Sequence, residues 1–419
     1  MTGRDEAIAT WINSRQDHLL DTVAAWSGIG SHSLDPAGLA RMADALTGPL
    51  AALGTVHRHP VPPWTVLDDR GRAVEQPLGD VLRVSHAASR ERLRVLLVIH
   101  YDTVYPPHER GSPIEFSRDG KILRGPGVAD AKGGIVVLLE ALAAWLRFGD
   151  PETLSWEVLL NADEELGSPG SGSLLAEAAG RHDLGLVFEP ALDEAGTLAG
   201  ARKGSGNFTI VVRGRAAHAG RHFDAGRNAV VAAAELATQL AALTDPARGL
   251  SVNVAAIHGG AGLNVVPDLA VLRVNVRAAT EADAQLATTR LAEAVAGIDG
   301  REGFSATMSG GFHCPPKPFD EPTRRLFDHV AACGRDLGLA LSVRPTGGVC
   351  DGNKLAAAGL PTLDTLGVRG GGIHGPEEHL VVESLAERAA LVAILLGRLA
   401  DGSLPWPRRA CAEEARPCS

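Results

Sequence analysis

Five short stretches of the sequence carry histidine or carboxylate side chains of the kinds that bind transition metals. These side chains are His100 in VIHYDTV, Asp130 in GPGVADAKGG, Glu164 and Glu165 in NADEELGS, Glu189 in VFEP, and His374 in GGGIHGPEEH. Zinc-type ions take imidazole and carboxylate ligands, and a carboxylate with two oxygens is suited to bridge two ions. Each side chain alone is more commonly structural, but together they favour a metal site that activates water.

Short apolar runs alternate with stretches of helical spacing from about Arg92 onward. This alternation is typical of an α/β protein with buried parallel strands. His100 ends the run LRVLLVIH, the two glutamates 164 and 165 follow SWEVLLN, and Glu189 ends LGLVFE. Because ligands of open α/β sheets bind beyond the carboxyl ends of the strands, these clusters are predicted to meet at one edge. We expect a mixed, mainly parallel sheet with helices on both faces.

The pattern changes between about Gly204 and Gly311. There the order is strand, helix, strand, strand, helix, strand, which is the ferredoxin-like pattern. The α/β pattern then resumes. We therefore predict a catalytic domain whose first part covers residues 1–203 and whose second part covers 312–419, interrupted by a ferredoxin-like domain over 204–311.

The composition of the chain argues against several classes of function. The chain has 419 residues, 45% of them hydrophobic, so it can bury a large core. Its 40 basic and 50 acidic residues give a net charge of -10, the wrong sign for a nucleic-acid binder. The five cysteines show no metal-binding spacing and suit a reducing compartment. Neither a signal peptide nor a membrane span is apparent, so we expect a cytoplasmic protein without membrane contact.

The motifs occur in the order found in one enzyme family. HYDTV, GPGVADAKGG, DEELGS, FEP, AAHAG, NVVP and IHGPEEH follow one another along the chain. From about Val95 to Leu399 the chain resembles the dinuclear zinc amidohydrolases that include glutamate carboxypeptidase, aminoacylase, acetylornithine deacetylase and succinyl-diaminopimelate desuccinylase, and it looks closest to the glutamate carboxypeptidase-like branch. The resemblance implies hydrolysis of an amide or peptide bond in a small carboxylate-bearing substrate, either by a carboxypeptidase or by an N-acyl amino acid deacylase.

The resemblance also implies roles for the metal-binding motifs. It implies two divalent ions, zinc or alternatively cobalt or manganese, with Asp130 bridging them. His100 and Glu189 would complete the coordination of one ion, and Glu165 and His374 would complete that of the other. Glu164 would be the general base. Asp102 resembles the carboxylate that orients the His100 imidazole, although a turn aspartate that caps local N–H groups is an alternative. His379 competes with His374 as the final ligand, and the H-x-x-x-E spacing favours His374.

His218 lies in GRAAHAGR, inside the predicted inserted domain. Its family counterpart donates a hydrogen bond to the tetrahedral intermediate, and in relatives it often reaches the active site of the partner subunit. The resemblance therefore implies a homodimer in which residues 204–311 serve as both lid and dimer contact.

Five further residues are candidates for substrate binding. Asn264 in NVVP and Arg277 in VNVRA resemble lid residues that hold the substrate carboxylate, a task that suits a bidentate arginine. A solvent-facing position on an alternating strand would explain Arg277 equally well. Arg202 is a candidate near the same mouth, and Gly347 and Gly348 in TGGVCDGN are predicted to let the backbone approach the substrate closely.

Two other classes of function stay open. In one, Cys350 acts as a nucleophile with a nearby histidine and needs no metal, whereas free cysteine is more often a small buried hydrophobe. In the other, the chain is a catalytically silent small-molecule binding protein of the same fold. Ala131, Ala217 and Cys350 depart from the family pattern, but none of these departures removes a ligand or the base.

Overall fold

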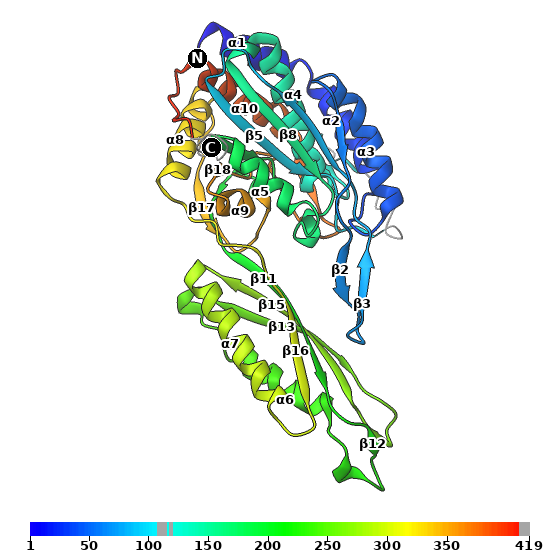
Figure 1. Cartoon of the computed structure of the whole chain (residues 1–419). Coiled ribbons are helices and arrows are strands. Elements are labelled where there is room, and N and C mark those ends of the chain that lie inside the picture. Colours follow the sequence, from blue (N-terminus) through cyan, green and yellow to red (C-terminus); the bar gives the residue numbers. More distant parts are fainter. Residues whose placement is uncertain (107–114, 117–119, 410–419) are drawn as a thin grey trace, which may run out of the picture.

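The computed structural model describes residues 1–106, 115–116 and 120–409. The molecule is elongated: a larger body, in which helices cover a central sheet, continues into a narrower part built from a second sheet and its own helices (Figure 1). No helix within the described ranges has the length and apolarity needed to span a bilayer.

The central sheet of the body, within the described residues, has six strands in the order β1-β4-β8-β5-β9-β18. Their bounds are β1 (His57–His59), β4 (Val81–His86), β5 (Leu93–His100), β8 (Leu154–Asn161), β9 (Leu184–Val187) and β18 (Thr362–Leu363). Strands β8, β5, β9 and β18 run parallel, whereas β4 and β1 are antiparallel to their neighbours. The predicted mixed, mainly parallel sheet is confirmed.

Both faces of this sheet are covered, because side chains of the buried strands alternate between two hydrophobic cores. In β5, residues 95, 97 and 99 belong to one core, while 96 and 98 belong to the other. Helices α5 and α9 close the smaller core, and the other helices of the body close the larger one. The helices are α1 (Gly3–Asn13), α2 (Gln16–Ser27), α3 (Pro36–Ala51), α4 (Gly134–Phe148), α5 (Gly172–Arg181), α8 (Glu321–Asp336), α9 (Asp351–Ala357) and α10 (Ser384–Asp401).

The narrower part contains a four-stranded antiparallel sheet in the order β13-β15-β11-β16, here called the inserted sheet. Its elements follow the predicted order, namely β11 (Gly204–Arg213), α6 (Ala229–Ala241), β13 (Ser251–Gly259), β15 (Leu269–Ala278), α7 (Glu281–Asp299) and β16 (Ser305–Cys314). Alternate residues such as Phe208 and Leu272 form a core with α6 and α7. The opposite face carries polar side chains, among them Asn207 and Asn275. The domain boundaries at 204 and 311 stay a prediction.

Short strand pairs and turns complete the described fold. The strands are β2 (Trp64–Leu67) with β3 (Ala73–Gln76), β10 (Leu198–Arg202) with β17 (Val343–Thr346), β12 (Ala217–His218) with β14 (Val265–Val266), and the small sheet of β19 (Gly370–Gly371), β20 (His379–Val381), β7 (Ile122–Arg124) and β6 (Glu115–Phe116). The short helical turns are Val128–Gly133, Pro151–Thr153, Glu164–Leu166, Phe223–Ala225 and Pro246–Arg248.

Candidate metal centre

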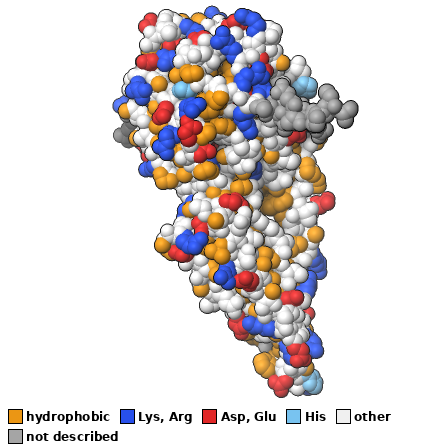
Figure 2. Space-filling model, turned by 60° about the vertical axis from the view of Figure 1, so that its left-hand side comes forward, with side chains coloured by type: hydrophobic (Ala, Val, Ile, Leu, Met, Phe, Trp, Pro, Cys, Tyr) orange, Lys and Arg blue, Asp and Glu red, His pale blue; other side chains and the backbone are white. Residues whose placement is uncertain are grey.

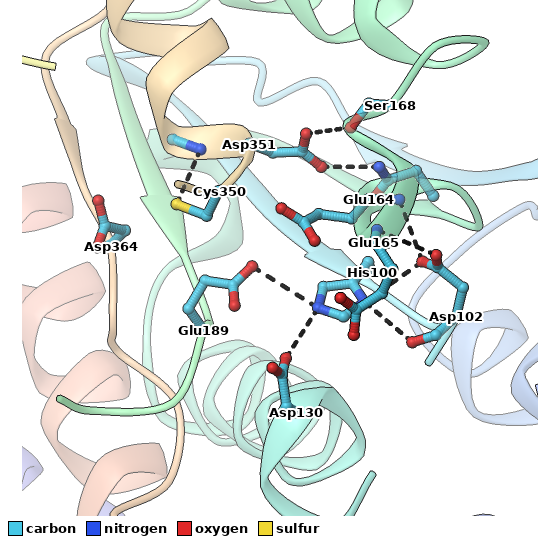
Figure 3. A network of polar contacts seen from close by, with 12 residues as sticks. His100, Asp102, Asp130, Glu164, Glu165, Ser168, Glu189, Cys350, Asp351 and Asp364 are labelled. Atoms are coloured by element: carbon cyan, nitrogen blue, oxygen red, sulfur yellow. Dashed lines mark hydrogen bonds and ion pairs between the residues drawn. The ribbon is translucent and has the colours of Figure 1, made fainter. Parts of the chain in front are cut away.

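Four of the predicted residues lie at the carboxyl ends of neighbouring strands of the central sheet. His100 is the last residue of β5, Glu164 and Glu165 begin the turn beyond β8, and Glu189 follows β9. Because β5 pairs in parallel with both β8 and β9, the three strand ends open on the same edge. Figure 3 shows these side chains pointing toward one another.

Asp130 and His374 reach this edge from loops. Asp130 lies in the irregular turn Val128–Gly133 that leads into α4, and His374 lies in the glycine-rich loop between β19 and β20. His374 has a φ of 63°, a left-handed conformation that costs a non-glycine residue about 1–2 kcal/mol. Such conformations concentrate at functional sites, where the surrounding structure maintains them.

The side chains form two groups that share one carboxylate. His100, Asp130 and Glu189 make the first group, and Asp130, Glu165 and His374 make the second; within each, the potential ligand atoms all lie within 4.8 Å of one another. Asp130 Oδ1 lies 3.1 Å from His100 Nε2, and Asp130 Oδ2 lies 3.1 Å from His374 Nε2. Asp130 thus presents one oxygen to each group, which is the arrangement that a bridging ligand needs.

The charge and burial of this cluster fit a pair of divalent cations. Burial, together with the nearby Asp130 carboxylate, raises the pKa of Glu165 to about 7 and that of Glu189 to about 8. Oε1 of Glu165 is buried without a hydrogen-bond partner among the described residues. Several buried carboxylates packed together are costly unless cations compensate them. With imidazole nitrogens beside them, the donors suit zinc-type ions.

Histidines already offset part of this negative charge. Burial acts to raise the pKa of Asp130, but hydrogen bonds from His100 and His374 outweigh it and hold this pKa below its ordinary value. The hydrogen bond to Asp130 in turn raises the pKa of His374 to about 11.

Asp102 contacts both the His100 imidazole and nearby backbone N–H groups, so both interpretations of this residue stay predictions. The His100 Nδ1 atom lies 3.0 Å from the backbone carbonyl oxygen of Asp102 and 3.3 Å from its Oδ1, which leaves Nε2 of that ring to face Asp130. The two carboxylate oxygens of Asp102 also accept the backbone N–H groups of Glu164 and Glu165, each at 3.2 Å, and Oδ2 accepts the Ser33 hydroxyl at 2.6 Å. One carboxylate therefore holds the imidazole and the turn that carries the two glutamates.

A cavity of about 730 Å³ opens beside the cluster, between the body and the inserted sheet. Asp130, Glu164, Glu165, Glu189 and His374 line one side. The polar face of the inserted sheet lines the other with Ser205, Asn207, Asn275, Arg277 and His313. A cavity of this size can enclose a small organic ligand.

Arg277 and Arg202 both line this cavity, but their surroundings differ. Arg277 is half-buried, donates from Nε to Asn275 at 3.0 Å, and has no ion-pair partner within the described residues. Arg202 donates to Asp364 through Nε and Nη2 and to the Gly348 carbonyl through Nη1. Gly348 lines the cavity, whereas Gly347 is not among its lining residues. The Arg277 guanidinium therefore has fewer partners than that of Arg202 and is more available to a ligand.

His218 and Asn264 lie away from the cavity. His218 lies in β12 and Asn264 directly precedes β14 at the narrow end of the molecule, where Ala219 N donates to the Asn264 carbonyl. His218 is exposed, as are the neighbouring Phe223 and Leu263. Figure 2 shows histidine and hydrophobic side chains at this end.

The two competing candidates occupy other surroundings. His379 Nε2 lies 2.8 Å from Glu194 rather than in the cluster. Cys350 is buried at the start of α9, where its sulfur accepts the Gly352 N–H, and burial raises its pKa well above the ordinary value. A buried thiol that stays protonated is a poor nucleophile, so the cysteine-nucleophile alternative is not favoured. Cys411 and Cys418 lie outside the described residues.

The sequence pattern favours His374 without assigning a role to Glu378, and it misses Trp64. Glu378 is buried, and its carboxylate accepts the backbone N–H groups of Gly127, Ala129 and Asp130. Its position four residues after His374 was an available signal, the H-x-x-x-E spacing. Trp64 lines the cavity from the β2–β3 hairpin, and nothing in its local sequence marks it.

Comparison with known proteins gives consistent matches. The family model described as Peptidase family M20/M25/M40 matches residues 96–398. Carboxypeptidase G2 from Pseudomonas sp. is 28% identical over 415 residues, which cover 95% of this chain and 93% of that protein. Succinyl-diaminopimelate desuccinylase from Alkalilimnicola ehrlichii is 29% identical over 320 residues, covering 72% of this chain and 82% of that protein.

The fold is also shared with solved structures. A tripeptidase from Staphylococcus aureus superposes with a TM-score of 0.72 at 20% sequence identity, covering 92% of this chain and 99% of that one. At this identity the likeness concerns the fold, including a mainly parallel sheet with helices.

Proposed function

Because the chain belongs to Peptidase family M20/M25/M40, a family of hydrolases, we propose that it hydrolyses an amide or peptide bond in a small carboxylate-bearing substrate with Glu164 as general base. The observation that carries this proposal is the pair of ligand groups joined through Asp130 at the floor of the cavity. One similar protein is named a carboxypeptidase and another a desuccinylase, so both peptides and N-acyl amino acids are candidate substrates.

We assign the two ligand groups to two divalent ions, zinc with cobalt or manganese as alternatives. His100, Asp130 and Glu189 would hold one ion, and Asp130, Glu165 and His374 the other. When bound, such ions would lower the pKa of a water molecule toward about 7 and would polarise the substrate carbonyl.

The protein groups supply the proton transfers and the positioning. Glu164 lines the cavity beside the ligand groups, where its carboxylate can take the proton of the attacking water and pass it to the departing amine. The Asp102 carboxylate fixes the backbone of Glu164 and so limits the movement of this base. Arg277 lines the cavity, has no ion-pair partner within the described residues, and would hold the substrate carboxylate.

The proposed active site also includes His218, which would come from a second subunit. Because His218 and Asn264 lie at the narrow end and do not line the cavity of their own chain, we propose that a homodimer brings them to the cavity of the partner. There His218 would donate a hydrogen bond to the oxyanion of the tetrahedral intermediate. The exposed Leu263 and Phe223 beside it suit such a contact. The charge and cysteine arguments support a cytoplasmic protein that acts on small molecules rather than nucleic acid.

The test uses metal removal and one substitution. Protein stripped by a chelator and resupplied with zinc, cobalt or manganese is assayed on a panel of N-acyl amino acids and dipeptides. Activity should disappear and return with metal. Glu164→Gln should lower kcat by a factor of about 100 to 10,000 with metal content unchanged, whereas Glu177→Gln, an exposed change on α5, should leave kcat unchanged.

Two results would contradict the proposal. Hydrolysis at an unchanged rate after chelator treatment would show that the ligand groups do not hold a catalytic metal. Tight binding of panel compounds without turnover would instead support the catalytically silent binding protein.

A further inference from the structure

The β2–β3 hairpin is an arm that leaves the body. Its strands pair only with each other within the described residues. The turn is closed by Asp68, whose carboxylate accepts the N–H groups of Arg70 and Arg72 at 2.8 Å each. A two-stranded hairpin is marginally stable by itself, so its position depends on what it packs against.

The tip of the arm is fastened to the inserted sheet. Arg273 of β15 donates from Nη2 to the Leu67 carbonyl at 2.6 Å and to Asp69 at 3.1 Å. Asp69 also lies 3.5 Å from His258 of β13. Gly71 packs so closely on Val211 of β11 that an added Cβ would lie 2.9 Å from Val211 Cγ1. The arm therefore lies along the helix-free face of the inserted sheet.

The same face continues from the fastened tip to the cavity. Residues 273, 275 and 277 of β15 share it because side chains alternate along a strand, and the last two line the cavity. The arm runs back along this direction and brings Trp64, the first residue of β2, to the cavity wall. Trp64 is half-buried, and no described residue accepts its ring N–H or stacks on its ring. Its indole is therefore available to a ligand.

The cavity combines this ring with other apolar groups and with a guanidinium that has no ion-pair partner among the described residues. Leu166, Leu192 and Ile373 also line it, as does Arg277. Its volume of about 730 Å³ exceeds what a small acyl group such as acetyl fills, and falls in the range of larger organic ligands.

We propose that Trp64 is a specificity-determining residue whose indole packs against an aromatic or bulky apolar group of the substrate. This inference rests on the proposed function and names its substrate class: amides that carry a carboxylate at one point and a large apolar group at another. An aromatic pair of this kind adds stabilisation beyond the burial of apolar area.

The test compares matched substrates that differ in the acyl group. Values of kcat/KM for N-benzoyl- and N-acetyl-L-glutamate are measured on metal-loaded wild type, Trp64→Ala and Trp64→Phe. Trp64→Ala should lower kcat/KM for the benzoyl compound about 10-fold or more and change the acetyl compound by less than about 3-fold, while Trp64→Phe restores most of the preference. Thr65→Ala, the exposed neighbour on the opposite face of β2, is the control.

The possible results distinguish a failure of the Trp64 role from a failure of the proposed function. A benzoyl-to-acetyl ratio that is unchanged in Trp64→Ala overturns the role of Trp64 while hydrolysis itself stands. If the wild type hydrolyses neither compound, calorimetric binding of the same two compounds replaces turnover. A wild type that binds the benzoyl compound no better than the acetyl compound, or a Trp64→Ala protein that keeps the preference, overturns the inference.

Discussion

Glu378 ties together the loops that carry the candidate ligands. Its carboxylate accepts the N–H groups of Gly127, Ala129 and Asp130 at 2.9–3.0 Å, and Tyr105 donates its hydroxyl to the same carboxylate. The backbone of Glu378 belongs to the loop of His374. Tyr105, in turn, follows the strand that ends at His100. One buried side chain thus connects the segments of both ligand groups.

Glu378→Gln is expected to weaken metal binding without unfolding the protein. The amide has only one acceptor oxygen, so it cannot serve all the N–H groups that now meet the carboxylate. Changes to groups that orient ligands typically cost 10- to 100-fold in metal affinity. Affinity is measured for zinc by competition with a chromophoric chelator, and the Tm of the metal-free protein is measured alongside.

Two variants accompany this measurement. Tyr105→Phe removes the hydroxyl that contacts the Glu378 carboxylate and the Gly375 carbonyl. It should cause a smaller loss of zinc affinity, which keeps the test useful if Glu378→Gln folds poorly. Glu377→Gln alters the exposed neighbour and should leave zinc affinity unchanged. Equal zinc affinity in Glu378→Gln and Glu377→Gln would refute the positioning role of Glu378.

At the scale of elements, a buried cluster holds the place where the chain crosses between the two sheets. Arg202 ends β10 just before the chain enters the inserted sheet, and Lys317 lies just after it returns. Their backbones exchange hydrogen bonds of 2.9 and 3.0 Å. Asp364, beyond β18, accepts Arg202 on Oδ1 and lies 3.1 Å from Lys317 Nζ. Because Asp364 neutralises both Arg202 and Lys317, the Arg202 guanidinium is already paired and is less available to a substrate.

Asp364→Asn should destabilise the protein by about 3–5 kcal/mol, because it leaves two buried cations without their counter-charge. The free energy of unfolding from urea titration at pH 7 measures this loss. Asp44→Asn, which alters an exposed surface pair with Arg58, should change stability by less than about 0.5 kcal/mol. A loss in Asp364→Asn no greater than in this control would refute the stabilising role of Asp364.

The difference in unfolding free energy between wild type and Asp364→Asn should change with pH in a defined direction. Burial acts to raise the pKa of Asp364, but the charges of Arg202 and Lys317 outweigh it and lower the pKa. The contribution of Asp364 is therefore complete above the unfolded pKa of about 4 and is lost as pH falls through the lower folded value. The stability gap between wild type and Asp364→Asn should stay constant from pH 8 to 5 and close only in acid.

At the scale of the whole molecule, the elongated shape separates two groups that the proposed reaction uses together. Glu164 lies at the cavity and His218 at the narrow end (Figure 1). If a homodimer joins them, each site combines the body of one chain with the narrow end of the other. Such reciprocal sites follow from two-fold symmetry.

Mixed dimers of two inactive variants test this arrangement. In a dimer of Glu164→Gln with His218→Ala, one site keeps both residues if His218 acts across subunits. Random pairing should therefore restore about a quarter of the wild-type activity, measured on co-expressed chains with two different tags. If His218 acts within its own chain, every site lacks one residue and no activity returns, as in the control mixture of Glu164→Gln with the double variant.

Much of this protein follows from local sequence patterns. Alternation between apolar runs and helical spacing was enough for the α/β class, because the period of side chains along strands and helices is a local property. The strand-end positions of His100, Glu165 and Glu189 followed in the same way, since parallel strands open on one edge. The motif order extended this to Asp130 and His374, whose roles as ligands stay predictions.

The tertiary structure decided the contacts between distant parts of the chain. Glu378 meets Asp130 across 248 positions of sequence, and Arg202 meets Asp364 across 162. Trp64 lies at the cavity on an arm whose tip is hydrogen-bonded to Arg273 across 206 positions of sequence. A local pattern shows which face of a strand a residue occupies, but the group that it faces depends on how the sheets pack. For that reason the candidate ligands were visible in the sequence, whereas the residues that position them and that shape the cavity became visible only in the fold.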